Sequence, residues 1–117
     1  MHALIIEQDL WIIVMIEDVL RELGYVSFDS AASVEAAIQS AERHCPDLIT
    51  SDLRLDAGNG VEAVRHICSA RPIAVVFITA TPWELEEHGE FAVIVPKPFD
   101  AATLKAGVAR ATRPFGV

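Results

Sequence analysis

The chain has 117 residues, the length of one compact domain, and 52% of them are hydrophobic while 22% are charged. This composition excludes a disordered protein, because enough apolar surface is available to build a core. Nine lysines and arginines against seventeen aspartates and glutamates give a net charge of −8, which disfavours nucleic acid as a partner, since its readers carry a basic face. The longest apolar run, residues 10–16, is far shorter than the ~20 residues that span a bilayer. We therefore expect a cytoplasmic protein without a membrane segment, forming one domain over residues 1–117.

Short apolar runs alternate with segments of helical periodicity along the chain. The runs predict strands at residues 3–6, 25–28, 48–49, 73–78 and 91–95. Apolar stripes predict four helices, at residues 12–23, 34–45, 61–67 and 104–111. Ser33 is a candidate N-cap of the second helix, and Gly24 a candidate stop for the first. This alternation predicts an open, doubly wound α/β fold, a parallel sheet with helices on both faces.

The connection between the fourth and fifth strands is unusually short. Only residues 80–90 join them, whereas a parallel crossover needs a dozen or more residues. Pro82 and Gly89 lie within this segment. We expect a helix of at most two turns there, or a partly mobile loop.

Cysteines and histidines show no spacing typical of a disulfide or metal site. Cys45 and Cys68 are too few for a disulfide scaffold, and we expect two reduced, half-buried thiols. We expect the four histidines on the surface: His2, His44, His66 and His88. Hydrolase signatures are missing, as is the phosphate-binding loop that a flavodoxin-like or nucleotide-dependent enzyme requires.

Polar side chains follow four of the predicted strands. They are Glu7, Gln8 and Asp9 after the first strand, Asp52 after the third, Thr79 at the end of the fourth and Lys97 after the fifth. In an open parallel sheet, functional residues gather at the carboxyl ends of the strands. The sequence therefore predicts that acids, a hydroxyl and an ammonium group meet at one edge of the sheet.

Four stretches together resemble the receiver domains of bacterial two-component response regulators, over essentially the whole chain. They read LIIEQD at residues 4–9, PDLITSDLRL at 46–55, FITA at 77–80 and PKPF at 96–99, and Gly60 follows Asp52 by eight places. The resemblance implies a flavodoxin-like sheet of five parallel strands in the order 2-1-3-4-5, here with a shortened fourth helix. It also implies a single-domain type without an output domain.

The resemblance further implies that Asp52 accepts a phosphoryl group from a phosphohistidine. The donor would be a histidine kinase or a histidine phosphotransfer protein. Mg²⁺ would be held by Glu7, Asp52 and the backbone carbonyl of Arg54. Thr79 and Lys97 would contact the phosphoryl group, and the Lys97–Pro98 bond would be cis. Such a domain is no enzyme beyond catalysing its own phosphorylation and dephosphorylation.

Two residues depart from the family pattern. Gln8 stands where the family usually has an aspartate, and a neutral amide is a weaker Mg²⁺ ligand, so we expect weak Mg²⁺ binding. Ile94 stands where many receivers have a Tyr or Phe whose position follows the Thr79 contact. The chain therefore lacks the ring of the usual aromatic switch, and ordering of residues 80–90 is a candidate substitute. A receiver-fold binding module that signals without phosphorylation is the alternative function.

The first predicted helix is apolar on every side at its start. Trp11, Ile13 and Val14 lie off the stripe that should face the core. An exposed apolar patch is typical of a contact surface. We expect these residues to bind the kinase or phosphotransfer partner; formation of a homodimer and burial of a wide stripe in the core are the alternatives.

Overall fold

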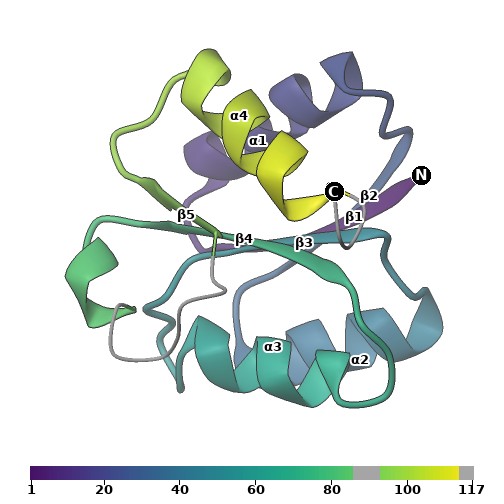
Figure 1. Ribbon diagram of the computed structural model, residues 1–117. Coiled ribbons are helices and arrows are strands. Elements are labelled where there is room, and N and C mark those ends of the chain that lie inside the picture. The colour runs from purple at the N-terminus through teal and green to yellow at the C-terminus, as the bar shows by residue number, and fades with distance from the viewer. Residues whose placement is uncertain (86–92, 114–117) are drawn as a thin grey trace.

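The computed structural model describes residues 1–85 and 93–113, and their elements alternate between strand and helix (Figure 1). In chain order they are β1 (His2–Ile6), α1 (Leu10–Glu22), β2 (Ser27–Ala31), α2 (Val34–Arg43), β3 (Leu48–Ser51), α3 (Gly60–Cys68), β4 (Ala74–Thr79), the 3₁₀ helix η1 (Pro82–Glu84), β5 (Val93–Pro96) and α4 (Ala101–Ala111). The five strands form one parallel sheet in the order β2-β1-β3-β4-β5. The predicted doubly wound fold and its strand order are confirmed.

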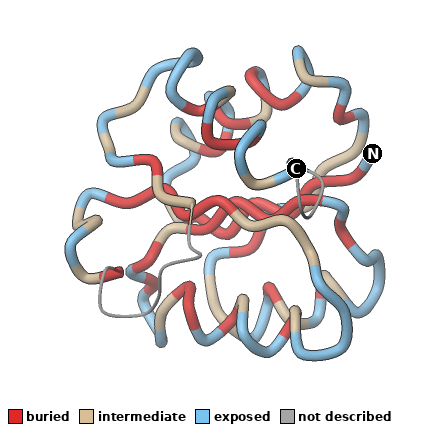
Figure 2. The backbone as a smooth tube through the Cα atoms, in the orientation of Figure 1, coloured by how far each residue is buried: buried red, intermediate tan, exposed pale blue. Residues whose placement is uncertain are grey.

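Helices cover both faces of the sheet, α1 and α4 on one side and α2 and α3 on the other (Figure 1). The central strands are the most buried part of the chain (Figure 2). The radius of gyration of the Cα atoms is 12.7 Å, as expected for a compact domain of this length. Within residues 1–85 and 93–113, every helix is too short or too polar to cross a bilayer.

The helix ends follow local sequence signals. Ser33 is the N-cap of α2, and its hydroxyl accepts a hydrogen bond from the Ala36 amide at 3.1 Å. Gly24 follows the C-cap of α1 with a φ of 98°, a left-handed conformation that favours glycine. Both predicted signals are therefore confirmed.

The second strand lies later in the chain than its apolar pattern indicated. The prediction placed it at residues 25–28, but β2 is Ser27–Ala31 and includes polar Asp29. As an edge strand, β2 pairs only with β1, so its side chains are less enclosed than those of a central strand. Tyr25 is buried ahead of the strand and packs in the core instead.

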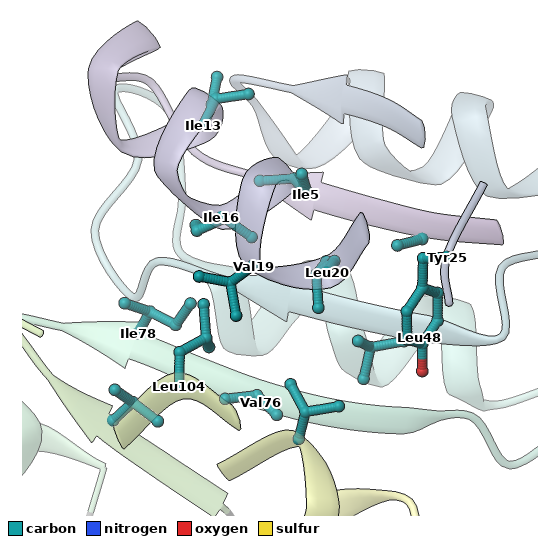
Figure 3. Close-up of a cluster of buried hydrophobic side chains, with 13 residues drawn as sticks. Ile5, Ile13, Ile16, Val19, Leu20, Tyr25, Leu48, Val76, Ile78 and Leu104 are labelled. Atoms are coloured by element: carbon teal, nitrogen blue, oxygen red, sulfur yellow. The ribbon is translucent and has the colours of Figure 1, made fainter. Parts of the chain in front are cut away.

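Ile13 belongs to the core, which corrects its predicted place in a partner-binding surface. It lies one turn before Ile16 on the helix face that packs on the sheet (Figure 3), because residues three apart share a face. Trp11 and Val14 are exposed, at 80% and 49%. The apolar patch on α1 consists of these two with Leu10 and Met15.

The short connection after β4 begins with a single turn of 3₁₀ helix, Pro82–Glu84. The expectation of at most two helical turns concerned all of residues 80–90, of which only residues 80–85 are described. Leu85 follows the turn and is buried. The remainder of the expected segment, including Gly89 and His88, lies outside the described residues.

Two expectations about surface residues are wrong. His2 is only 4% exposed, because β1 starts there and its ring is covered by polar side chains and by another histidine. Cys45 is exposed and not half-buried, whereas Cys68 is partly buried as expected. His44 and His66 are exposed, as predicted.

Candidate functional site

Backbone hydrogen bonds bring the carboxyl ends of the strands together. The Asp52 amide donates to the Ile6 carbonyl at 2.8 Å, so the residue after β3 is fixed to the end of β1. The Lys97 amide donates to the Thr79 carbonyl at 2.8 Å, which fixes the residue after β5 to the end of β4. Glu7, Asp52, Thr79 and Lys97 therefore meet at one edge of the sheet, as predicted.

The Lys97 ammonium lies between two carboxylates. Its Nζ atom is 3.2 and 3.1 Å from the two carboxylate oxygens of Glu7 and 3.3 Å from Oδ2 of Asp52. The exposed fractions of the side chains are 16% for Lys97, 4% for Glu7 and 16% for Asp52. Partly buried charges interact more strongly than charges on an exposed surface, because water screens them less. The Lys97–Pro98 bond is cis, as predicted.

Burial raises the pKa of the Glu7 carboxyl above its ordinary value, and the nearby Asp52 charge raises it further. Hydrogen bonds and positive charge from Lys97 act in the opposite direction without cancelling the increase. The folded state therefore holds this proton to a higher pH than the unfolded state does. The contribution of this carboxyl to the stability is greatest below its ordinary pKa, falls as the pH rises through the raised folded pKa, and does not change at higher pH.

Glu7→Gln is therefore expected to stabilise the metal-free protein at neutral pH and to raise its Tm. It removes the ionised carboxyl that burial disfavours, and with it the fall of stability above the ordinary carboxyl pKa. Thermal unfolding measured from pH 4 to pH 8 checks this. Glu42→Gln, at an exposed position of α2, is the control and should keep the pH dependence; an unchanged pH profile in Glu7→Gln would contradict the assignment.

Asp52 is held by its own loop as well. Its Oδ1 atom accepts a hydrogen bond from the Leu53 amide at 2.7 Å. Gly60, at the start of α3, donates its amide to the Leu53 carbonyl at 2.8 Å. A Cβ atom on Gly60 would lie 2.0 Å from the Asp52 carbonyl oxygen. The loop after β3 and the start of α3 thus approach so closely that only glycine fits.

The two residues after Glu7 have different roles. Asp9 is the N-cap of α1, and its carboxylate accepts from the amides of Trp11 at 2.9 Å and Ile12 at 3.5 Å. The Nε2 atom of Gln8 is buried and has no hydrogen-bond partner within the described part of the chain. A buried donor without a partner lowers the stability of the folded state. At this edge of the sheet, the Gln8 amide nitrogen is such a donor.

Thr79 belongs to a network of side-chain hydrogen bonds that the sequence did not predict. Its Oγ1 accepts from the Thr81 amide at 3.0 Å and lies 3.2 Å from the Thr81 hydroxyl. The Thr81 hydroxyl donates to Glu84 at 3.2 Å, and Glu84 pairs with Arg54. This ion pair lowers the pKa of Glu84. This hydrogen-bond network connects the end of β4 to the loop after Asp52. No motif marks Thr81 or Glu84, because their role depends on the folded turn.

Ile94 packs inward from β5. It contacts a buried cluster formed by Leu53, Val61, Phe77 and Leu85. Leu53 directly follows Asp52, and Leu85 directly follows η1. The residue at the family's aromatic position therefore lies in apolar packing that joins the site loop to the segment after β4.

A family model described as the response regulator receiver domain matches residues 3–109. The chain belongs to this receiver domain family. Among curated relatives, the transcriptional regulatory protein PdtaR of Mycobacterium tuberculosis is 32% identical over 97% of this chain and 58% of its own length. The phyllosphere-induced regulator PhyR of Methylorubrum extorquens is 32% identical over 94% of this chain and 43% of its own length. The receiver thus spans roughly half the length of these two relatives.

Solved receiver structures share the fold. The receiver domain of Erythrobacter litoralis PhyR superposes with a TM-score of 0.88 at 31% identity, covering 99% of this chain and 95% of that one. PhyR from Brucella abortus gives a TM-score of 0.83 at 30% identity, over 94% of this chain and 46% of that one. The edge described above is therefore the corresponding edge of a receiver domain.

Receiver domains generally bind Mg²⁺ in an acidic pocket, and the residues here fit such an ion. Mg²⁺ prefers carboxylate and carbonyl oxygens, and Glu7 and Asp52 already bracket one cationic group, the Lys97 ammonium. Asp9 caps α1 with its carboxylate, and the Gln8 side chain is uncharged. The donor set thus suits a hard divalent cation but offers less negative charge than three carboxylates would.

Proposed function

We propose that this receiver is a phosphorylation switch in which Asp52 accepts a phosphoryl group from a phosphohistidine of a partner and the changed surface signals by protein contact. The observation that carries the proposal is the Lys97 ammonium placed within 3.3 Å of Asp52 and Glu7 oxygens. A phosphoryl group is anionic, so its acceptor site needs positive charge and fixed positioning more than a strong nucleophile.

In the transfer, the N–P bond of the phosphohistidine breaks and an O–P bond to Asp52 forms. The electron pair of the broken bond stays on the leaving imidazole nitrogen, and the product is an acyl phosphate. Lys97 exchanges carboxylate contacts for a phosphoryl oxygen and neutralises its charge. Mg²⁺ held by Glu7, Asp52 and the Arg54 carbonyl would neutralise further phosphoryl charge.

The switch would operate through Thr79. Without a phosphoryl group, the Thr79 hydroxyl is hydrogen-bonded to Thr81. A phosphoryl group on Asp52 would offer this hydroxyl a charged acceptor, and hydrogen bonds to charged acceptors are stronger. Turning toward that acceptor would release Thr81, and with it the contact to Glu84. Ile94 would follow by repacking against Leu85. The signal would thus leave the site along the segment after β4.

Incubation with acetyl phosphate and Mg²⁺, followed by intact-mass measurement, tests the proposal. We expect one added phosphoryl group per chain, lost on omission of Mg²⁺. An unchanged mass would favour a receiver-fold binding module that signals without phosphate. The neutral Gln8 and the aliphatic Ile94 are the residues that favour this second candidate.

Gln8→Asp is expected to tighten Mg²⁺ binding by about tenfold or more and to speed phosphorylation. It adds a carboxylate to the donor set and removes an amide nitrogen that lacks a partner. A Mg²⁺ titration of the unphosphorylated protein checks this, with Gln39→Asp at an exposed position of α2 as the control. Equal affinities in both variants and the wild type would show that position 8 takes no part in metal binding.

The phosphodonor is proposed to dock on the apolar patch of α1. The helix starts directly after Glu7, Gln8 and Asp9, so its first turn borders the site, and Trp11 is its most exposed apolar residue. Aromatic side chains often anchor protein interfaces. Trp11→Lys should slow transfer from the kinase or phosphotransfer protein while leaving the acetyl phosphate reaction intact. Loss of self-association in this variant would assign the patch to a homodimer instead.

A further inference from the structure

A cluster of polar side chains covers the amino end of β1, at the opposite end of the strand from Glu7 and the site around Asp52. His2 opens the strand, whereas Glu7 follows its other end. The His2 Nδ1 atom lies 2.7 Å from Ser27 Oγ, and its Nε2 atom lies 3.0 Å from Asp29 Oδ2. His44, the C-cap of α2, stacks on the His2 ring with the centroids 3.6 Å apart and the planes 9° from parallel.

The fold builds this cluster from three separate elements. Ser27 pairs with His2 in the parallel register of β1 and β2, and Asp29 lies two residues further along β2 on the same face. The His2 side chain is 5% exposed and that of Asp29 is 41% exposed. His44 is exposed. The cluster is thus buried at His2, partly open to solvent at Asp29 and exposed at His44.

The donor atoms of three residues are close enough to share one ion. The imidazole nitrogens of His2 and His44 and a carboxylate oxygen of Asp29 all lie within 4.8 Å of one another. Two ligand atoms bound to one Zn²⁺ at its usual bond lengths are about 3.4 Å apart in a tetrahedral site. We infer that His2, Asp29 and His44 form a binding site for a divalent transition-metal ion such as Zn²⁺, with solvent completing the coordination.

The ligand set indicates this class of metal. Imidazole nitrogen suits Zn²⁺, Cu²⁺, Ni²⁺ and Fe²⁺, whereas Mg²⁺ and Ca²⁺ prefer oxygen alone. The site therefore differs in chemistry from the carboxylate pair at Asp52. It is also independent of the proposed phosphorylation, because none of its ligands belongs to that edge.

His2 is oriented before any metal binds. Its backbone amide donates to Asp47 Oδ2 at 2.7 Å, and its carbonyl accepts from the Asp47 amide at 2.8 Å. When Nε2 binds a metal, Nδ1 carries the proton and donates a hydrogen bond to Ser27 Oγ; when no metal is bound, the Ser27 hydroxyl can donate to Nδ1. A hydrogen bond to the far nitrogen of a ligating histidine is the usual support in metal sites.

Metal binding requires His44 to move. Parallel stacked rings cannot both direct an in-plane nitrogen at one ion, so the His44 ring must turn about its side-chain torsions. This movement is possible at an exposed residue that ends a helix. The stacked arrangement is therefore the metal-free state of the site, and the Asp29–His2 pair is the part already in position.

Zn²⁺ titration of the untagged chain by calorimetry, with Mg²⁺ in excess, tests the site. We expect one bound Zn²⁺ per chain and a raised Tm in its presence. His44→Ala should weaken binding by at least about 100-fold, and Ser27→Ala by about tenfold. His66→Ala, which removes an exposed histidine outside the cluster, should leave it unchanged. Co²⁺ should give a visible absorption spectrum that disappears in His44→Ala.

Two further variants keep the test decisive. Asp29→Asn leaves both histidines in place and should also weaken Zn²⁺ binding, so the result does not depend on a His2 variant that fails to fold. Cys45→Ser separates the site from binding by the neighbouring exposed thiol and should have no effect. Absence of Zn²⁺ binding in the wild type, or equal binding in His44→Ala and His66→Ala, would overturn the inference.

Discussion

Asp52→Asn is expected to abolish phosphoryl uptake from acetyl phosphate completely. The substitution keeps the shape of the side chain but removes the carboxylate oxygen that would form the O–P bond in the proposed transfer, and an amide makes no such acyl phosphate. Intact mass measured over the time course of the reaction is the readout. The variant should remain folded, because loss of the Asp52 charge removes one cause of the raised Glu7 pKa and leaves Lys97 paired with Glu7.

Asp56→Asn is the matched control, since it makes the same chemical change at an exposed position four residues along. It should take up phosphoryl groups at the wild-type rate. Thermal unfolding of both variants separates a chemical loss from an unfolding loss. Uptake that persists in Asp52→Asn at the wild-type level would place the acceptor at another residue and refute the proposed role.

Gly60→Ala is expected to destabilise the protein by about 3 kcal/mol, the upper part of the range for overpacked sites, and to lower Tm by about 10 °C. The added Cβ would lie 2.0 Å from the Asp52 carbonyl oxygen and 2.3 Å from Ser51 Oγ. The first neighbour is backbone and cannot turn aside. Relief of the clash must displace the loop that carries Asp52, so slower phosphorylation should accompany the lower Tm.

Gly24→Ala is the control for this prediction. Gly24 has a φ of +98° but no atom within 4 Å of a built Cβ, so the alanine meets only backbone strain of about 1–2 kcal/mol. Denaturant unfolding of both variants compares the two costs. A Gly60→Ala protein as stable as Gly24→Ala would show that the contact between α3 and the Asp52 loop is not tight.

Local signals were sufficient to predict much of the fold and the residues at the sheet edge that carries Asp52 and Lys97. The strand-and-helix alternation, Ser33 and Gly24 depend on neighbours within a few residues. In a parallel sheet the carboxyl ends of all strands lie at one edge, so the sequence alone could predict that Asp52 and Lys97 lie close together.

The errors arose where distant residues decide the environment. Ile13 looked like a surface residue because the start of α1 is apolar on all sides, and only packing selects the buried face. The position of β2 was missed because an edge strand tolerates polar residues that look like a loop. The hydrogen-bond network from Thr79 to Arg54 was not predicted because it depends on the η1 turn.

By itself, the sequence determined the fold class, the strand order through family likeness, and which acids, hydroxyl and lysine follow the strands. Only the tertiary structure decided that Lys97 contacts both carboxylates, that the Gln8 amide nitrogen is left unpaired, and that His2 and His44 stack. The physical reason is range: backbone periodicity and capping are local, whereas ion pairs, desolvation and ring stacking join residues tens of positions apart.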